Sequence, residues 1–349
     1  MRTPPASHPR RRTRTLPQHR AAVRHLAPGT GRRYLPHMRI VRDTAYLDPA
    51  DRGAAVAIGN FDGVHLGHRV VIDTAREIAG QTDAPLGVMT FEPHPREVFA
   101  PDAPPFRLMN AEARANRLAK VGVQMLYEVP FNRALAGYEP DMFAEKIIHD
   151  ALGLTHVVVG EDFYFGRNRA GTAETLGELG AKLGFGVTIS PILSLGETEV
   201  SSTAIRKALT DGDPRTAAKM LGHWHRIEGK VIHGEQRGRE LGYPTANMSI
   251  EGLHPPKFGV YAVKVDVLTG PHAGTYNGAA SIGIRPMFGE NLPNCETFLF
   301  DFSGDLYDEH LSVALVDYLR PELKFDSLEA LITRMGEDCA EAGRILADV

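Results

Sequence analysis

Residues 54–68 read AAVAIGNFDGVHLGH, and this stretch decides the fold of the first half of the chain. The small and branched apolar residues at 54–58 predict a strand that is buried on both faces. Gly59 and Gly63 break the run and let the backbone turn tightly. Residues 69–79 then predict a helix, because their apolar side chains can share one face. The stretch therefore predicts a strand, a glycine-bearing turn and a helix in direct succession.

The turn and the start of this helix predict an anion-binding site. Free N–H groups and the positive end of the helix dipole point toward a ligand there. His65 and His68 are three residues apart and can lie on the same side of the first helical turn, and Gly67 lets a ligand approach the backbone. Such a histidine pair also fits a metal site or a buried core. Alternatively, the two imidazoles donate hydrogen bonds to the charged oxygens of a nucleotidyl-transfer transition state.

The longer string GNFDGVHLGH at residues 59–68 is more specific than a histidine pair. It resembles the N-terminal module of the bacterial bifunctional riboflavin kinase/FAD synthetase (FMN adenylyltransferase) family, and its HxGH part is similar to the nucleotidylyltransferase signature. The resemblance implies that His65 and His68 are catalytic. It further implies that ATP is bound by residues of the turn and the helix start, namely Gly59, Asn60, Phe61, Asp62 and Gly67.

The composition is that of an ordinary globular protein of 349 residues, long enough for two domains. Cys295 and Cys339 cannot form a disulfide framework and lack metal-site spacing, which favours a reducing cytoplasm. No apolar run approaches the roughly 20 residues of a membrane span. Residues 1–37 hold nine arginines and no Asp or Glu, so the rest of the chain is more acidic than the net charge of −4 suggests. We therefore expect neither a nucleic acid nor a membrane as a partner.

The chain divides into three segments that differ in composition and in the pattern of predicted elements. Residues 1–37 are rich in Arg, Pro and His and predict a disordered basic extension. The segment could serve as a basic arm or a transit peptide, or it could be sequence upstream of a natural start at Met38. Residues 38–222 alternate strands and helices, which predicts a parallel sheet covered by helices, the α/β Rossmann-like nucleotidylyltransferase domain that the resemblance implies. Residues 223–349 hold short strands between glycines and predict a small antiparallel β-barrel, the riboflavin kinase domain of the resemblance. A C-terminal helix at 327–347 is expected to have an apolar face of Leu328, Leu331, Ile332 and Met335.

Three further motifs follow predicted strands of the first domain, where ligands of parallel sheets gather. On residues alone, TFEPHPR at 90–96 is a rigid turn, GEDFYFGR at 160–167 is a turn with aromatic packing and VSSTAIR at 200–206 contains a capped helix start. The resemblance implies that they face the flavin and the nucleotide, whereas His94 is assigned no chemistry. The implied flavin-binding residues are Phe91, Pro93, Phe163 and Phe165; Asp162, Ser202 and Thr203 are implied for ATP, and Arg206 for catalysis through its forked guanidinium.

The barrel region contains GRELGYPTAN at 238–247. Thr245 and Asn247 are two residues apart, so both side chains point to one side of an extended chain, and their oxygens are hard ligands that suit Mg²⁺. Taken alone, this pattern is more often a turn. With the preceding loop it resembles the riboflavin kinase signature, which implies ATP binding at Gly238 and Gly242 and flavin binding at Gly259, Tyr261 and Arg320. Glu296 matches the family's catalytic base, which takes a proton from the 5′-hydroxyl of riboflavin; a solvated strand-edge residue is the alternative.

Three positions depart from the family pattern. Many members have Thr where Met287 stands, His where Phe298 stands and Gly where Asp308 stands. Met287 removes a hydroxyl near the expected kinase site. We expect Phe298 to alternate off the face of Glu296 in a regular strand, so that its exchange changes packing only.

The resemblance covers nearly the whole chain from Met38 onward and implies a bifunctional flavin-cofactor enzyme. The barrel is expected to phosphorylate riboflavin to FMN with ATP, and the first domain to adenylylate FMN to FAD with release of pyrophosphate, both with Mg²⁺. A cytoplasmic monomer or weak homo-oligomer is expected. The alternatives are a nucleotidylyltransferase for another phosphate acceptor, with the barrel as an appendage, and a flavin-binding or regulatory protein without turnover.

Overall fold

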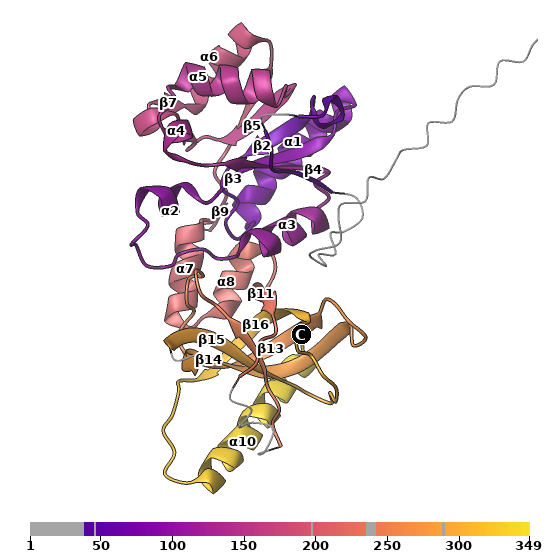
Figure 1. Cartoon of the computed structure of the whole chain (residues 1–349), viewed down its shortest axis with the longest axis vertical. Coiled ribbons are helices and arrows are strands. Elements are labelled where there is room, and N and C mark those ends of the chain that lie inside the picture. Colours follow the sequence, from indigo (N-terminus) through magenta and orange to yellow (C-terminus); the bar gives the residue numbers. More distant parts are fainter. Residues whose placement is uncertain (1–37, 45–46, 197, 235–241, 288–289) are drawn as a thin grey trace, which may run out of the picture. The chain divides into compact units, whose positions relative to one another are not determined.

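The structure is a computed structural model that describes residues 38–44, 47–196, 198–234, 242–287 and 290–349 (Figure 1). The predictions for residues 1–37 and for Gly238 lie outside the described residues, as does the side chain of Met287.

Six parallel strands form the sheet of the first half, in the order β1-β4-β3-β2-β5-β8. Their bounds are Arg39–Val41 (β1), Ala55–Ile58 (β2), Leu86–Glu92 (β3), Met125–Pro130 (β4), His156–Gly160 (β5) and Gly186–Ser190 (β8). From β2 the chain builds the sheet first toward β3 and β4 and later, on the other side, toward β5 and β8. Because ligands of such sheets bind at the carboxyl ends of strands beside this reversal, the ends of β2 and β5 mark the expected site.

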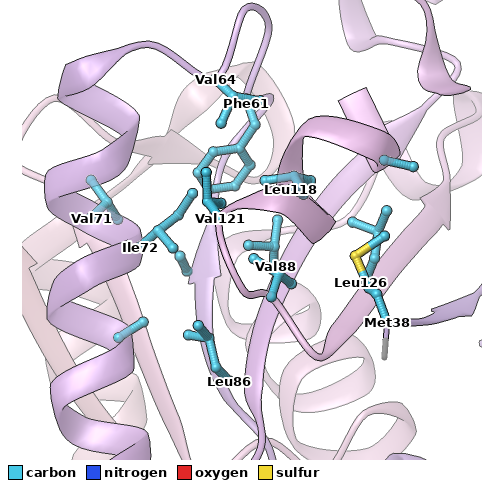
Figure 2. Packing of buried hydrophobic residues seen from close by; sticks show 14 of the residues in the cluster. Met38, Phe61, Val64, Val71, Ile72, Leu86, Val88, Leu118, Val121 and Leu126 are labelled. Atoms are coloured by element: carbon cyan, nitrogen blue, oxygen red, sulfur yellow. The ribbon is translucent and has the colours of Figure 1, made fainter. Parts of the chain in front are cut away.

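Helices cover both faces of the sheet and bury β2 completely. Ala55 and Ala57 point into a core under α1 (Leu66–Thr82) and α3 (Ala111–Lys120); Figure 2 shows Ile72, Val88 and Leu118 within it. Val56 and Ile58 point into a second core on the other face. The elements over that face are α5 (Pro140–Phe143), the π-helix η2 (Ala144–Ala151) and α6 (Ala173–Leu183). The predicted doubly buried strand is confirmed, since every residue of β2 is at most 3% exposed.

Short elements carry or connect the motif loops of the first half. They are η1 (Pro49–Asp51), α2 (Pro95–Phe99), α4 (Arg133–Ala136), β6 (Tyr164–Phe165), η3 (Arg167–Arg169), β7 (Gly171–Thr172), β9 (Ser194–Leu195), β10 (Thr198–Glu199), α7 (Ser202–Asp211) and α8 (Pro214–Leu221). Gly222 ends α8 in the left-handed conformation, with φ 72°. The division of the chain between residues 222 and 223 remains a prediction.

Six antiparallel strands form the second sheet, in the order β11-β16-β13-β14-β15-β12. Their bounds are His225–Lys230 (β11), Ala246–Ser249 (β12), Gly259–Val267 (β13), Gly274–Met287 (β14), Glu290–Leu299 (β15) and His310–Arg320 (β16). An isolated antiparallel bridge between Ile232 and Asn247 brings the two edges together. Side chains from all six strands fill one enclosed core, so the predicted small barrel is confirmed as a nearly closed one.

The predicted apolar face of the C-terminal helix, α10 (Leu328–Ala347), is wrong. Leu328 is 52% and Ile332 36% exposed, whereas Asp338, Ala342 and Leu346 are buried. The second half of the helix makes the contact, because Ala342 and Leu346 pack on the outer face of the barrel. No described helix combines the length and apolarity that a membrane crossing requires.

Candidate active site

The turn after β2 brings the two histidines of the motif together. His65 is the N-cap of α1, and its Nδ1 accepts a hydrogen bond from the His68 backbone N–H at 3.2 Å. The two imidazole rings stack with centroids 3.6 Å apart and an interplanar angle of 16°. A Cβ at Gly67 would lie 3.1 Å from the His65 ring and from the Val200 carbonyl, so only glycine fits here without displacement. The local sequence therefore builds a helix start with paired imidazoles.

Burial keeps both imidazoles neutral. It lowers the pKa of His65 to about 4, with a further contribution from the Arg206 charge. Burial also lowers the pKa of His68 well below its ordinary value, and His65 adds to the shift. Since Nδ1 of His65 accepts a hydrogen bond, the ring proton resides on Nε2, which can donate. The site thus offers hydrogen-bond donation without a standing charge on the rings.

Arg206, on α7, is fixed beside the histidines by two groups of the first half. Its Nη2 lies 2.5 Å from Asp62 Oδ2, and its Nε donates to the Phe106 carbonyl at 2.6 Å. The other carboxylate oxygen of Asp62 accepts from the Leu108 N–H at 2.8 Å. Burial raises the pKa of Asp62, and the Arg206 charge opposes this shift. Asp62 therefore holds Arg206, and the contact with ATP that the resemblance implies stays a prediction.

The serines at the start of α7 have different roles. Ser201 caps the helix by accepting from the Ala204 N–H at 3.3 Å. Ser202 donates its hydroxyl hydrogen to the Asp62 carbonyl oxygen at 2.8 Å, which ties α7 to the turn after β2. Ser201 and Ser202 both line the cavity described next, whereas Thr203 is exposed and outside that lining.

A cavity of about 1060 Å³ opens at the carboxyl ends of the strands. It is large for a ligand pocket, since most span roughly 300–1,000 Å³, and has room for two substrates side by side. The sequence-predicted residues that line it are Gly59, Asn60, Phe61, Asp62, His65, Gly67, His68, Phe91, Asp162, Phe163, Phe165, Ser202 and Arg206. Pro93 is outside the lining. The four motifs thus meet around one space, as expected from their positions after strands.

Sequence reasoning missed several residues of this cavity. Arg96 lies with its guanidinium 4.5 Å from the centre of the Phe106 ring, and Arg169 lies 4.8 Å from that of Tyr164. His94 lines the cavity and caps α2 by accepting from the Arg96 N–H at 3.1 Å. Three of these five residues, His94, Arg96 and Tyr164, stand inside the quoted motifs, so the motifs themselves could have indicated them, and Arg169 follows such a motif by two residues. Phe106 stands outside the motifs, and the sequence around it does not indicate a position at the cavity.

Partly buried ion pairs hold the loop that carries His94. Arg107 is bonded to both carboxylate oxygens of Glu92, at 3.1 and 2.8 Å, and also pairs with Glu97. Arg114 donates to Glu92 at 2.8 Å. These partners are 10 to 22 residues apart and follow no periodic pattern, so the sequence alone does not indicate them. They fix the wall of the cavity formed by the segment after β3.

Thr245 and Asn247 line a second cavity of about 280 Å³ in the barrel. Asn247 is 8% exposed, and its Oδ1 accepts from Asn294 Nδ2 at 3.3 Å. Among the described residues, the buried Oδ1 of Asn294 has no hydrogen-bond partner. These oxygens are the hard donors that suit Mg²⁺, so the residues present fit the ion. No cluster of three His, Cys, Asp or Glu side chains suited to a metal occurs in the described part of the chain.

Glu296 lies directly across the β12–β15 pair from Asn247, so the two side chains share a face. It is half-buried and does not line the cavity. Phe298 lies two residues further along β15, which pairs with β14 in unbroken register. The expectation that Phe298 leaves the face of Glu296 is therefore wrong, because residues two apart in a regular strand point to the same side. Phe298 contacts Tyr243 edge-on, with ring centroids 5.2 Å apart.

The other barrel residues implied by the resemblance have contacts within the framework of the barrel, and their roles in ligand binding stay predictions. A Cβ at Gly259 would lie 2.2 Å from the Arg320 carbonyl oxygen, so β13 and β16 could not approach this closely with another residue there. Tyr261 is buried and donates its hydroxyl hydrogen to the Lys257 carbonyl. Arg320 pairs with the buried Asp338 of α10 at 2.6 Å. None of these three lines the described cavity of the barrel, and neither does the exposed Gly242.

Asp308 stands where a glycine is usual in the family and keeps a backbone that favours glycine. Its φ is 67°, in the left-handed region, which Asp tolerates better than most residues. Its carboxylate pairs with Lys230 at 2.8 Å, and that partner lowers the pKa of Asp308. The departure is thus accommodated locally.

The parallel sheet, with paired histidines and a held arginine at its ligand-binding edge, defines a nucleotidyltransferase fold joined to a barrel domain. Two family models match the chain: FAD synthetase over residues 47–204 and riboflavin kinase over residues 221–346. The chain belongs to the bifunctional riboflavin kinase/FMN adenylyltransferase family, which confirms the resemblance drawn from residues 59–68.

Relatives of known name cover nearly the whole chain. It is 40% identical over 311 residues to the bifunctional riboflavin kinase/FMN adenylyltransferase of Pseudomonas fluorescens, with 89% of this chain and 98% of that one covered. Identity to the Bacillus subtilis protein of the same name is 37% over 302 residues, with 85% and 93% covered. A solved structure described as a macrolide-efflux protein from Streptococcus pneumoniae is 31% identical, with a TM-score of 0.74 and coverage of 86% and 97%.

Proposed function

We propose that the chain makes FAD from riboflavin in two ATP-dependent steps. The barrel transfers the γ-phosphoryl group of ATP to the 5′-hydroxyl of riboflavin, which gives FMN and ADP. The α/β domain then transfers AMP from a second ATP to the phosphate of FMN, which gives FAD and pyrophosphate. The observation that carries this proposal is the grouping of His65, His68 and Arg206 around a cavity large enough for both substrates of the second step.

In the adenylyl step, the protein's contribution is positioning and charge stabilisation. A phosphate oxygen of FMN attacks the α-phosphorus of ATP, and negative charge grows on the α-phosphate oxygens. Nε2–H of His65 donates to these oxygens, and His68 donates beside it. The guanidinium of Arg206, held by Asp62 and the Phe106 carbonyl, faces the phosphates without having to reorganise. The aromatic residues Phe91, Phe163 and Phe165 form an apolar wall for the flavin ring.

In the kinase step, Glu296 accepts the proton of the riboflavin 5′-hydroxyl as that oxygen attacks the γ-phosphorus. Asn247, opposite Glu296 on β12, and Thr245 two residues before it would hold Mg²⁺. When bound, Mg²⁺ neutralises phosphate charge in the kinase step, and the adenylyl step likewise requires it. We further propose cytoplasmic localisation, supported by two unpaired cysteines, and a monomer or weak homo-oligomer.

One assay separates this function from the alternatives. The full chain is incubated with riboflavin, ATP and Mg²⁺, and the flavins are separated by chromatography. Appearance of FMN followed by FAD is the expected result, and EDTA in place of Mg²⁺ stops both steps. Tight flavin binding without product would instead indicate a binding protein. Failure to adenylylate supplied FMN, with turnover of another phosphate acceptor, would indicate a different nucleotidyltransferase.

A further inference from the structure

A loop of the barrel, residues 253–257, contacts the helix that carries Arg206. His254 Nε2 lies 3.1 Å from the Arg206 carbonyl oxygen and 3.0 Å from the Thr210 hydroxyl oxygen. A carbonyl oxygen only accepts, so this contact is a hydrogen bond when Nε2 carries the ring proton. The Lys257 backbone N–H also donates to the Leu209 carbonyl at 2.9 Å. The loop therefore bonds to α7 through a side chain and through its backbone.

The same loop contacts the second segment that holds Arg206. The His254 backbone N–H donates to the Arg107 carbonyl at 2.8 Å, and Leu253 forms a parallel bridge with Arg107. The preceding residue, Phe106, provides the carbonyl to which Arg206 Nε donates. One residue of the barrel, His254, is thus bonded both to the backbone of Arg206 and to the segment that fixes its guanidinium.

His254 itself is held in place. Leu253 is 8% exposed and belongs to the barrel core, so the loop is anchored at one end. Two prolines, Pro255 and Pro256, follow and restrict the backbone. No residue of 253–257 lines the cavity that contains Thr245 and Asn247. The loop therefore contacts the first domain and lies outside the lining of this barrel cavity.

We propose that His254 is a positioning residue for adenylyl transfer, supplied by the barrel to hold Arg206 at the cavity of the α/β domain. This inference rests on the proposed function. It makes FAD formation dependent on the barrel beyond the supply of FMN, while riboflavin phosphorylation does not depend on His254.

Steady-state kinetics on full-length variants tests the proposal, with FMN supplied for one reaction and riboflavin for the other. For His254→Ala we expect kcat for FMN adenylylation to fall about tenfold, the effect of losing roughly one hydrogen bond. KM for FMN and the rate of riboflavin phosphorylation should stay within about twofold. His254→Gln should recover most of the adenylylation rate, because its amide N–H can replace Nε2–H. His272→Ala, which removes a barrel histidine packed edge-on against Phe302, is the matched control and should keep the parental adenylylation rate.

Three outcomes would overturn the proposal. One is a His254→Ala variant with the parental kcat for adenylylation. Another is an equal fall of both activities together with a lower melting temperature, which would assign His254 to general stability. A third is a His254→Gln variant as impaired as His254→Ala, which would exclude the hydrogen bond as the cause. If the parental chain itself forms no FAD from FMN, the proposed function fails and this inference fails with it.

Discussion

His65 caps the helix on which His68 lies, and their imidazole rings stack 3.6 Å apart. The cap uses Nδ1 of His65 as an acceptor, so the opposite nitrogen, Nε2, carries the proton. The backbone geometry of one helix start therefore selects the tautomer that can donate to a phosphate oxygen. This coupling of local structure to chemistry is the basis of the first two predictions.

Replacing His65 or His68 by Ala should abolish FAD formation while FMN still accumulates from riboflavin. Each imidazole stabilises charge only in the adenylyl step, so the loss should be about 100-fold or more, as for removal of one oxyanion donor. Chromatography of the flavins formed from riboflavin and ATP measures both steps in one sample. Normal FAD synthesis by the double variant would show that the histidines are not catalytic.

Lowering the pH should destabilise the fold through His65. Its pKa is about 4 in the folded protein, below the ordinary value of 6.5, so the unfolded chain binds more protons between these values. The contribution of neutral, buried His65 to the free energy of unfolding is fully present above pH 6.5 and is lost as the pH falls toward 4. At pH 5 the free energy of unfolding should be lower by about 2 kcal/mol. His65→Asn keeps a capping residue but does not titrate. Urea unfolding at pH 7 and pH 5 should show a smaller pH effect in this variant than in the parent; an equal effect would contradict the assignment.

Asp62→Asn should impair adenylylation by at least about tenfold without affecting riboflavin phosphorylation. The amide keeps the size of the side chain but removes the charge that pairs with Arg206 at 2.5 Å. Arg206 then lies inside the protein without its charged partner, and its guanidinium loses its fixed orientation. Lys207→Ala, which removes an exposed pair with Asp211 on the same helix, is the control and should be near neutral. Unchanged FMN adenylylation by Asp62→Asn would exclude the positioning role.

Glu296→Gln should stop FMN formation from riboflavin, because an amide cannot accept the hydroxyl proton. The same variant should still convert supplied FMN to FAD, since Glu296 lies in the barrel and outside the cavity at Arg206. Feeding the variant either riboflavin or FMN separates the two steps. Phosphorylation at the parental rate would show that Glu296 is not the base. Loss of both activities would show a stronger dependence between the domains than the contacts of His254 imply.

Several features followed directly from local sequence. The run at 54–58 is buried on both faces, and His65 and His68 meet because they are three residues apart at a helix start. The shared face of Glu296 and Phe298 also follows from local sequence, since a spacing of two places both side chains on one side of a strand. The face of α10 was different: its apolar residues suggested Leu328 and Ile332 as the contact, but the barrel meets the other half of the helix.

The sequence by itself determined the fold class, the order of the elements and the motifs that surround the large cavity. The fold class, the element order and the motifs depend on hydrophobic periodicity and on residues that are close together in the chain, so they can be read without knowing which distant segments meet. Only the tertiary structure decided that Asp62 holds Arg206, 144 residues away, and that His254 of the barrel supports the same arginine. Such pairs form when distant segments pack, and their partners are selected by distance in space and by burial, to which spacing along the chain gives no guide.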